Sequence, residues 1–414
     1  MKKLVALLLA LTLCIGLCAC GATAEKPAEE TPATTGETET PATDAKDIKV
    51  GFIFLHDENS TYDLNFINAA KAAAAELGLS DDQIMMKTNI AESQACYDAA
   101  AELVDAGCDL VITDSFGHES FALAAAKEFP EVQFVSCTGV KAHTEGLSNF
   151  HNAFASIYEG RYLAGVAAGL KLNEMIENGD ITAEEAKMGY VGAYPYAEVK
   201  SGYTSFFLGA RSICPSVTME VTFTSSWYDE ALEKEAANKL INNGCVLISQ
   251  HADSMGAPTA CETAGVPNVS YNGSTVSACP NTFIVSSRID WTPFFVHAIT
   301  SVANGEALGY DWTGTLATGS VVLTEINENA AAAGTAEKIA EVTKALEDGT
   351  VKVFDTANFT VNGETVTTYL ADVDDLGDYV GETEVIENGE FLESYYRSAP
   401  YFDLDIDGIT NLDA

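Results

Sequence analysis

Basic side chains are scarce in this sequence, which has 21 lysine and arginine residues against 61 aspartate and glutamate residues and a formal net charge of -40 at pH 7. A surface this acidic repels phosphate groups, which argues against binding to nucleic acid or to anionic lipid. A neutral or cationic small molecule is the partner that this charge favours. Solubility alone explains the same charge equally well.

The 10 cysteines form no motif typical of a metal or redox site. The seven in the body of the chain include no C-x-x-C pair, and no histidines are spaced to complete a zinc site. His56-Asp57 and His118-Glu119 are adjacent residues, which do not share a face. Seven thiols cannot all pair with one another, and stretches such as Gly244–Leu247 are apolar. We therefore expect mostly free thiols in the core, and neither a metal nor a cofactor.

Motifs of hydrolytic catalysis are also missing, since the sequence has neither a nucleophile elbow nor a paired-carboxylate motif. We predict a protein that is not an enzyme and has no catalytic residues. The alternative is an extracellular nucleosidase in which Asp253 and Asp57 serve as acid and base.

Only one long hydrophobic run is present, from Leu4 to Leu17, and it is too short to span a membrane. Lys2 and Lys3 precede it, and Leu17-Cys18-Ala19-Cys20 follows it, which is the pattern of a lipoprotein signal peptide. We predict a signal peptide over residues 1–19 and a lipid anchor on Cys20, which would place the protein on the extracytoplasmic face of the cell membrane. The alternative is an ordinary secretory signal.

Residues 20–46 are predicted to form a disordered, acidic tether. Beyond Cys20 they consist almost wholly of alanine, threonine, glutamate, proline and glycine, with no aromatic or branched aliphatic side chain to bury. The acidic charge keeps such a segment extended, so the folded body can stand off the membrane.

From about residue 47 the sequence alternates short apolar strands with longer segments of helical period. Strands that are apolar on both faces and separated by helices indicate a parallel sheet covered on both sides. The same alternation of strands and helices begins again near Met188, which predicts a second sheet. The expected strands are 50–55, 110–113 and 132–136 in the first sheet, and 188–192, 219–223, 246–249 and 268–271 in the second.

Polar and aromatic residues gather just after several of these strands. In open parallel sheets, ligands bind outside the carboxyl ends of the strands, so two such sheets facing each other would form a ligand-binding cleft. The four segments are Asp114-Ser115-Phe116, Trp227-Tyr228-Asp229, His251-Ala252-Asp253-Ser254 and Tyr271-Asn272-Gly273.

These loops and several helices resemble the basic membrane protein family of ABC-transporter substrate-binding lipoproteins. The matching segments follow the family order over roughly residues 47–325. They are 113–117, 154–165, 188–191, 208–212, 227–229, 250–254 and 291–295.

The resemblance implies a type I periplasmic-binding-protein fold, an α/β architecture with two doubly wound parallel-sheet lobes joined by a hinge. The first lobe would comprise 47–154 with about 291–310, and the second 155–290 with about 316–400. It also implies capture of a purine base or nucleoside-like ligand and delivery to an ABC permease complex.

Two departures from the family pattern bear on the ligand. The loop Asp57–Tyr62 is shorter than in base-binding members and offers Ser60 and Tyr62 where they have glycines and a tryptophan. Asn272 stands where members often have an aspartate, which removes a charged acceptor for ribose hydroxyls. We therefore expect a purine-like ring to be recognised more readily than an intact nucleoside.

Three residues are candidates for contact with a ring. Trp227 would stack on the ligand or plug the lobe interface. Tyr62 would cover the opposite ring face or pack on Phe66. Trp291 would line the cleft or lie in the core.

Polar candidates come from the same loops. Asp253 would accept hydrogen bonds from ring N–H or amino groups, and Ser254 would assist, unless both simply cap the next helix. Ser115 and the backbone of Phe116 would meet a ring nitrogen or carbonyl, unless Ser115 is a cap. Asn272 both donates and accepts, so it suits several ring edges. A ligand-sensing regulatory lipoprotein with the same fold is the alternative to an importer.

Overall fold

The computed structural model describes residues 48–374 and 380–413. The predicted signal peptide, the anchor at Cys20 and the tether lie outside these residues. Within them, no helix is both long enough and apolar enough to cross a membrane.

The first sheet is entirely parallel and has the strand order β11-β5-β4-β3-β1-β2. Its strands are β1 (Val50–Ile53), β2 (Ile84–Lys87), β3 (Leu110–Thr113), β4 (Gln133–Cys137), β5 (Phe150–Ala155) and β11 (Asp311–Gly314). Its helices are α1 (Thr61–Leu77), α2 (Gln94–Asp105), α3 (Glu119–Glu128), α4 (Ala142–Glu145) and α9 (Thr292–Asn304), with 3-10 turns η1 (Asp81–Gln83) and η2 (Phe116–His118).

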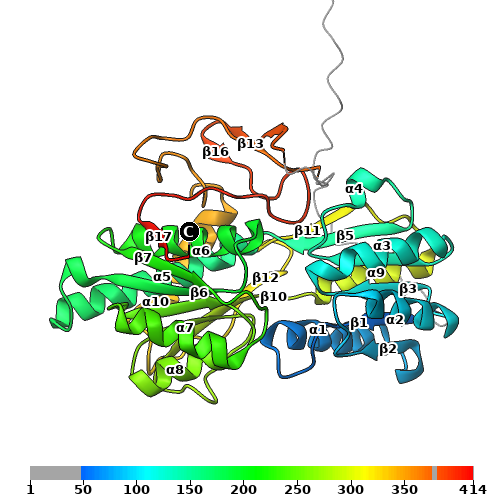
Figure 1. Ribbon diagram of the computed structural model, residues 1–414, viewed down its shortest axis with the longest axis horizontal. Coiled ribbons are helices and arrows are strands. Elements are labelled where there is room, and N and C mark those ends of the chain that lie inside the picture. The colour runs from blue at the N-terminus through cyan, green and yellow to red at the C-terminus, as the bar shows by residue number, and fades with distance from the viewer. Residues whose placement is uncertain (1–47, 375–379, 414) are drawn as a thin grey trace, which may run out of the picture. The chain divides into compact units, whose positions relative to one another are not determined.

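Side chains of successive strand residues point to opposite faces of the first sheet, so each face has its own core. Phe52 packs with α1 and α9 on one face, whereas Ile53 packs with α2 and α3 on the other. This explains why the strands of this sheet are apolar on both sides, and Figure 1 shows the helices around it.

The second sheet has the order β12-β10-β9-β8-β6-β7-β17, and β12 is its one antiparallel strand among the described residues. Its strands are β6 (Lys187–Gly192), β7 (Thr218–Phe223), β8 (Leu247–His251), β9 (Asn268–Tyr271), β10 (Phe283–Ile289), β12 (Val321–Leu323) and β17 (Ile409–Asn411). Its helices are α5 (Ile157–Asn178), α6 (Ala197–Ile213), α7 (Glu230–Asn242), α8 (Gly256–Ala264) and α10 (Thr335–Glu347), with the turn η3 (Ala183–Glu185).

Each sheet contains the same doubly wound order, β2-β1-β3-β4-β5 in the first and β7-β6-β8-β9-β10 in the second. The predicted α/β class with two parallel sheets is therefore confirmed. Strands β2, β5, β10, β11, β12 and β17 are not among the strands predicted from the sequence. The chain passes between the sheets after β5, after β10 and after β11, and we propose that the two lobes follow the two sheets.

Residues 354–374 and 380–413, here called the C-terminal extension, pack largely on the helices of the second sheet. Phe354 and Phe402 stack with ring centroids 4.5 Å apart, and both belong to the same core as α5 and α6. Two small hairpins lie in this segment, β13 (Leu370–Ala371) with β14 (Thr383–Glu384) and β15 (Ile386–Glu387) with β16 (Glu390–Phe391). Figure 1 shows the extension in orange and red beside α6.

Glycines let α5 and α6 approach each other closely. A Cβ on Gly165 would lie 2.0 Å from the carbonyl oxygen of Phe206, and one on Gly209 would lie 2.1 Å from that of Tyr162. Since neither backbone oxygen can move without its helix, glycine is required at both positions. This crossing fixes Arg161 and Glu198, which lie near the first turns of α5 and α6.

We predict that Gly165→Ala destabilises the protein by about 3 kcal/mol, because the added methyl group forces the two helices apart. The urea midpoint of purified protein measures this loss. Glu177→Ala, at an exposed position near the end of the same helix, is the matched control and should change stability by less than about 0.5 kcal/mol. Equal midpoints for the two variants would contradict the proposed helix contact.

Candidate ligand-binding site

A cavity lies where the carboxyl ends of the strands of the two sheets meet. Its enclosed volume is about 20 Å³, room for about one water molecule, and about 350 Å³ is unoccupied when the adjoining open solvent is included. Its lining from the first sheet is Leu55, His56, Tyr62, Asp63, Ser115, Phe116 and Thr138, and from the second Glu198, Trp227, His251 and Asp253. The site therefore lies where the sequence predicts a cleft.

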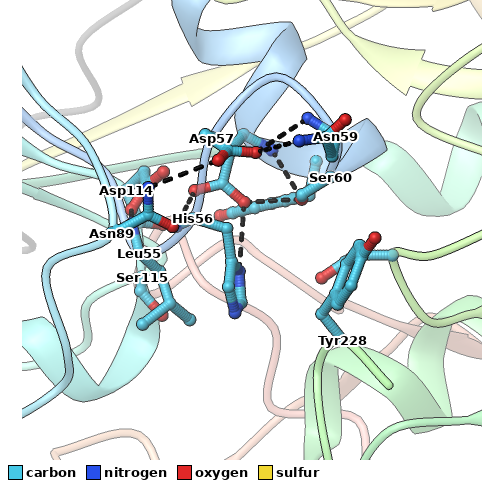
Figure 2. A network of polar contacts seen from close by, with 12 residues as sticks. Leu55, His56, Asp57, Asn59, Ser60, Asn89, Asp114, Ser115 and Tyr228 are labelled. Atoms are coloured by element: carbon cyan, nitrogen blue, oxygen red, sulfur yellow. Dashed lines mark hydrogen bonds and ion pairs between the residues drawn. The ribbon is translucent and has the colours of Figure 1, made fainter. Parts of the chain in front are cut away.

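The loop after β1 is held by hydrogen bonds to buried carboxyl groups (Figure 2). The backbone N–H of Leu55 donates to Asp114 Oδ1 at 3.1 Å, and that of His56 donates to Asp63 Oδ1 at 2.7 Å. Ser60 caps α1, because its hydroxyl oxygen accepts from the N–H of Asp63. These bonds fix the side chains that the loop presents to the cavity.

Asp63 and Asp114 behave as a pair in which one carboxyl group is neutral. Burial, followed by the charge of Asp63, raises the pKa of Asp114 well above its usual range. Burial also acts to raise the pKa of Asp63, but hydrogen bonds from His56 and Asp114 outweigh it and lower the pKa overall. We conclude that protonated Asp114 donates to ionised Asp63, since two buried adjacent carboxylates would repel each other. Asp63 therefore faces the cavity as an anion.

Asp253 connects the two sheets through its backbone. Its N–H donates to the carbonyl oxygen of Trp227 at 3.0 Å, and its own carbonyl oxygen accepts from the N–H of Thr61 at 3.0 Å. The side chain is 5% exposed. Burial raises the pKa of Asp253 well above its usual range, and the carboxylate of Asp63 adds to this. The Asp253 carboxyl group therefore tends to hold a proton within the site.

Behind the second-sheet side of the cavity lies a buried cation. The Arg161 guanidinium lies 4.3 Å from the ring centroid of Tyr271 and donates from Nη2 to the carbonyl oxygen of Gln250 at 3.3 Å. Burial lowers the pKa of Arg161 to about 10, so it stays charged at neutral pH. Attraction to Glu198 acts against this lowering of the Arg161 pKa, and the guanidinium charge offsets part of the acidity of the cavity.

His251 lies between this cation and the ligand space. Its Nε2 is 3.3 Å from Glu198 Oε1. Burial lowers the pKa of His251 despite the hydrogen bond to Glu198. A neutral imidazole that donates to Glu198 fits both observations. The ring also lies 4.6 Å from that of Tyr271, so its orientation is fixed from two sides.

Aromatic rings form a continuous row on one side of the site. Trp227 meets Tyr194 edge-on with centroids 5.1 Å apart, and Tyr194 stacks on Tyr196 at 5.1 Å. Tyr196 then contacts Phe116 of the first sheet at 5.5 Å. The two ends of this row, Trp227 and Phe116, both line the cavity.

Strained backbone occurs at three strand ends near the site. Thr138 after β4, Ser225 after β7 and Asn272 after β9 have φ angles of 66°, 58° and 67°. Asparagine tolerates this region, but a β-branched threonine does so rarely. Strain of about 1–3 kcal/mol per residue is typical of binding and active sites. Its presence at Thr138, which lines the cavity, supports a functional role for this region.

Five of the eight predicted ligand residues line the cavity: Tyr62, Ser115, Phe116, Trp227 and Asp253. Tyr62 donates from its hydroxyl to the carbonyl oxygen of Asp114 at 2.6 Å and also packs on Phe66. Ser115 does not cap the turn that follows, because its hydroxyl donates to Glu92 Oε1 at 2.6 Å.

The other three predicted residues lie elsewhere. Trp291 is 1% exposed and stacks on Phe66 in the core of the first sheet, so the core alternative is correct for it. Ser254 accepts from the N–H of Gly256 at the start of α8, although the N-cap residue of that helix is Met255. Asn272 is buried outside the lining and accepts from Asn65 Nδ2 at 3.4 Å, while favouring the charged form of Asp253.

Six residues of the lining were not predicted from the sequence: Leu55, His56, Asp63, Thr138, Glu198 and His251. Thr138 follows β4 directly, so the rule that identified the other loops applies to it as well, whereas Glu198 lies in the first turn of α6. Asp63 lies inside α1 and carries no such signal.

One group of acidic side chains has the spacing of a cation site. Oxygens of Asp372, Asp374 and Glu382 lie within 4.8 Å of one another. Glu382 Oε1 accepts from the N–H of Val373 at 2.8 Å and from that of Asp374 at 3.3 Å. These backbone bonds account for the cluster without an ion.

We predict that Thr138→Gly raises the free energy of unfolding by about 1 kcal/mol, because glycine adopts the observed φ without steric strain. Urea unfolding measures the change. Asn362→Gly is the control: this exposed residue also has a positive φ, 53°, but asparagine tolerates it, so stability should hardly change. A loss of stability in Thr138→Gly would contradict the strain.

Residues 53–353 match the Bmp family, described as ABC transporter substrate-binding protein PnrA-like. A purine-binding protein of Brucella abortus is 31% identical over 261 residues, which cover 62% of this chain and 69% of that protein. A putative ABC transporter glucose-binding protein of Haloferax volcanii is 32% identical over 221 residues, 53% of each chain, so this chain spans about half of that relative.

Solved structures share the fold. An ABC transporter solute-binding protein from Aeropyrum pernix has a TM-score of 0.62 at 17% identity, covering 74% of this chain and 93% of its own. One from Conexibacter woesei has a TM-score of 0.59 at 19% identity, covering 74% and 98%. These matches confirm the periplasmic-binding-protein fold. The chain therefore belongs to the Bmp family of PnrA-like ABC transporter substrate-binding proteins, as its motifs predict.

Proposed function

We propose that this substrate-binding protein captures a purine-type ligand between its two sheets. In this proposal it is a lipoprotein held by Cys20 on the extracytoplasmic face of the membrane, and it passes the ligand to an ABC permease complex. The observation that carries the proposal is the small cavity in which the indole of Trp227 and the carboxyl group of Asp253 face one space.

The cavity suits a flat heterocycle. Trp227 from the second sheet and Tyr62 and Phe116 from the first provide aromatic surfaces on both sides of the space. Stacking of a base on an aromatic side chain contributes about 1–3 kcal/mol. The row of rings behind Trp227 holds its indole in place, which reduces the entropy lost on binding.

The polar groups suit the edge of a purine. A protonated Asp253 offers one O–H donor and one carbonyl acceptor side by side. Adenine presents the complementary pair, an N7 acceptor next to an N6 amino donor. The carboxyl groups of Asp63 and Glu198 add acceptors for further N–H groups, and the acidity of the site disfavours any ligand that carries phosphate.

Two relatives point to different ligands. The Brucella relative is named for purine binding, which supports the purine proposal. The Haloferax relative is named as a putative glucose-binding protein, and carboxylates also accept hydrogen bonds from sugar hydroxyls. A hexose is therefore the second candidate ligand.

We predict that calorimetry detects binding of at least one of adenine, hypoxanthine, guanosine and adenosine, and that Trp227→Ala weakens it by about 5- to 150-fold, the loss of one stacking partner. Tyr310→Ala, which removes an exposed aromatic side chain outside the cavity lining, is the control and should bind normally. Heat from glucose alone would favour the sugar, and no heat from any purine would refute the proposal.

We also predict that Asp253→Ala weakens purine binding by about 10-fold or more, because it removes both the donor and the acceptor that meet the edge of the ring. The same titrations measure it. Asp57→Ala is the control, since Asp57 bonds to Asn59 and Asn89 in the neighbouring loop and does not line the cavity. Equal affinities of the two variants would exclude Asp253 from ligand contact.

A further inference from the structure

A second, larger cavity adjoins the ligand site. It holds about 380 Å³, and three of its lining residues, Phe116, Thr138 and Glu198, also line the first cavity. The two spaces therefore share a wall, and a ligand in the first would have its edge at the opening of the second. We call the second space the outer chamber.

Aromatic rings stand at the shared boundary. Phe116 reaches it from the first sheet and Tyr196 from the second, with centroids 5.5 Å apart. They are 38% and 43% exposed, although both are large apolar rings. Rings left this exposed at a cavity edge offer contact surface to a bound molecule.

The C-terminal extension supplies the far wall of the outer chamber. Tyr369, Leu370 and Tyr401 line it, and Leu370 is 54% exposed. The family match ends at residue 353, so this wall is built by residues outside the matched region. The ligand space of this chain therefore includes a component beyond the family region.

This wall is held firmly in place. The Arg397 guanidinium donates to three carbonyl oxygens, those of Val373 at 3.0 Å, Pro400 at 3.1 Å and Ala399 at 3.2 Å. Lys200 of α6 pairs with Asp403 at 2.7 Å. A wall that is fixed before binding loses little entropy when it meets a ligand.

The extension is bonded to the first sheet as well. Ser398 donates from its N–H and its hydroxyl to Asp311 Oδ1 at 2.8 and 2.7 Å, and the hydroxyl of Thr144 donates to the carbonyl oxygen of Asp374 at 2.7 Å. The outer chamber is thus enclosed by groups from both sheets and from the extension.

The chemistry of the lining disfavours an anionic group and favours an apolar one. Glu198, Asp372 and Asp403 make the outer chamber acidic, and the one arginine in its lining already bonds to backbone carbonyls. An anionic substituent is therefore disfavoured. The exposed surfaces of Phe116 and Leu370 instead gain from contact with an apolar or aromatic group.

We propose that the outer chamber receives an uncharged, apolar substituent on the purine-type ligand, so that the protein prefers substituted purines to the bare base. This inference rests on the proposed purine function and deepens it. The first cavity holds the purine ring, and the C-terminal extension contacts the group attached to that ring.

Calorimetry with a matched set of probes tests this preference. We expect N6-benzyladenine or 9-benzyladenine to bind about 10-fold more tightly than adenine, because the phenyl ring is buried in the outer chamber. The 4-carboxybenzyl analogue of the better probe should lose that gain. Equal affinities of adenine and both benzyl derivatives would overturn the inference while leaving the purine function intact. If none of the probes binds, the purine function fails and the inference fails with it.

A variant of the wall provides the second measurement. Leu370→Trp fills part of the outer chamber from an exposed position, so it should abolish the advantage of the benzyl derivative and leave adenine binding unchanged. Leu232→Trp, on an exposed residue of α7 that lines neither cavity, is the matched control and should keep the advantage. An unchanged advantage in Leu370→Trp would place the substituent elsewhere and overturn the inference.

Discussion

A backbone contact between the two sheets lies at the ligand space and sets the spacing of its walls. The N–H of Thr61, the first residue of α1, donates to the carbonyl oxygen of Asp253, whose own N–H donates to the carbonyl oxygen of Trp227. One chain of peptide groups therefore sets how far the helix of the first sheet stands from the two ligand loops of the second. Because backbone bonds do not depend on side-chain rotamers, they hold the cavity walls at a defined spacing.

Neighbouring groups in both sheets limit the acidity of the site. In the first sheet, Asp114 remains protonated so that Asp63 can be ionised. In the second sheet, Arg161 supplies a positive charge behind Glu198 and His251. Without the proton on Asp114 and the positive charge of Arg161, several buried carboxylates would repel one another. The protein can therefore present acceptors to a ligand and remain folded.

Much of the fold was predictable, because period and polarity are local properties of the sequence. Apolar strands separated by helices gave the two sheets and the class of fold. The missed strands show the limit of this approach. Strand β2 is half-buried at the edge of its sheet and carries a lysine, so it lacks the continuous apolar signal of β1 and β3.

The site was predictable only in part, and the two tryptophans show why. Trp227 and Trp291 each stand between a strand and a helix. Trp227 lines the cavity, whereas Trp291 turns toward Phe66 of α1, a helix more than two hundred positions away in sequence. Such a choice depends on which distant element packs alongside, and no local pattern encodes it. For the same reason Asp63, inside a helix, had no signal as a ligand residue.

The position of β17 has a consequence for how the protein folds. This strand adds to the free edge of β7, and Asp413 beside it accepts from Thr222 and Phe223, 191 and 190 positions earlier in the chain. A sheet completed by so distant a segment has a high contact order, and folding slows as contacts become less local. Until that segment arrives, β7 remains an unprotected edge that another chain can pair with. Assembly of the second sheet is therefore the stage at which this protein is most open to aggregation.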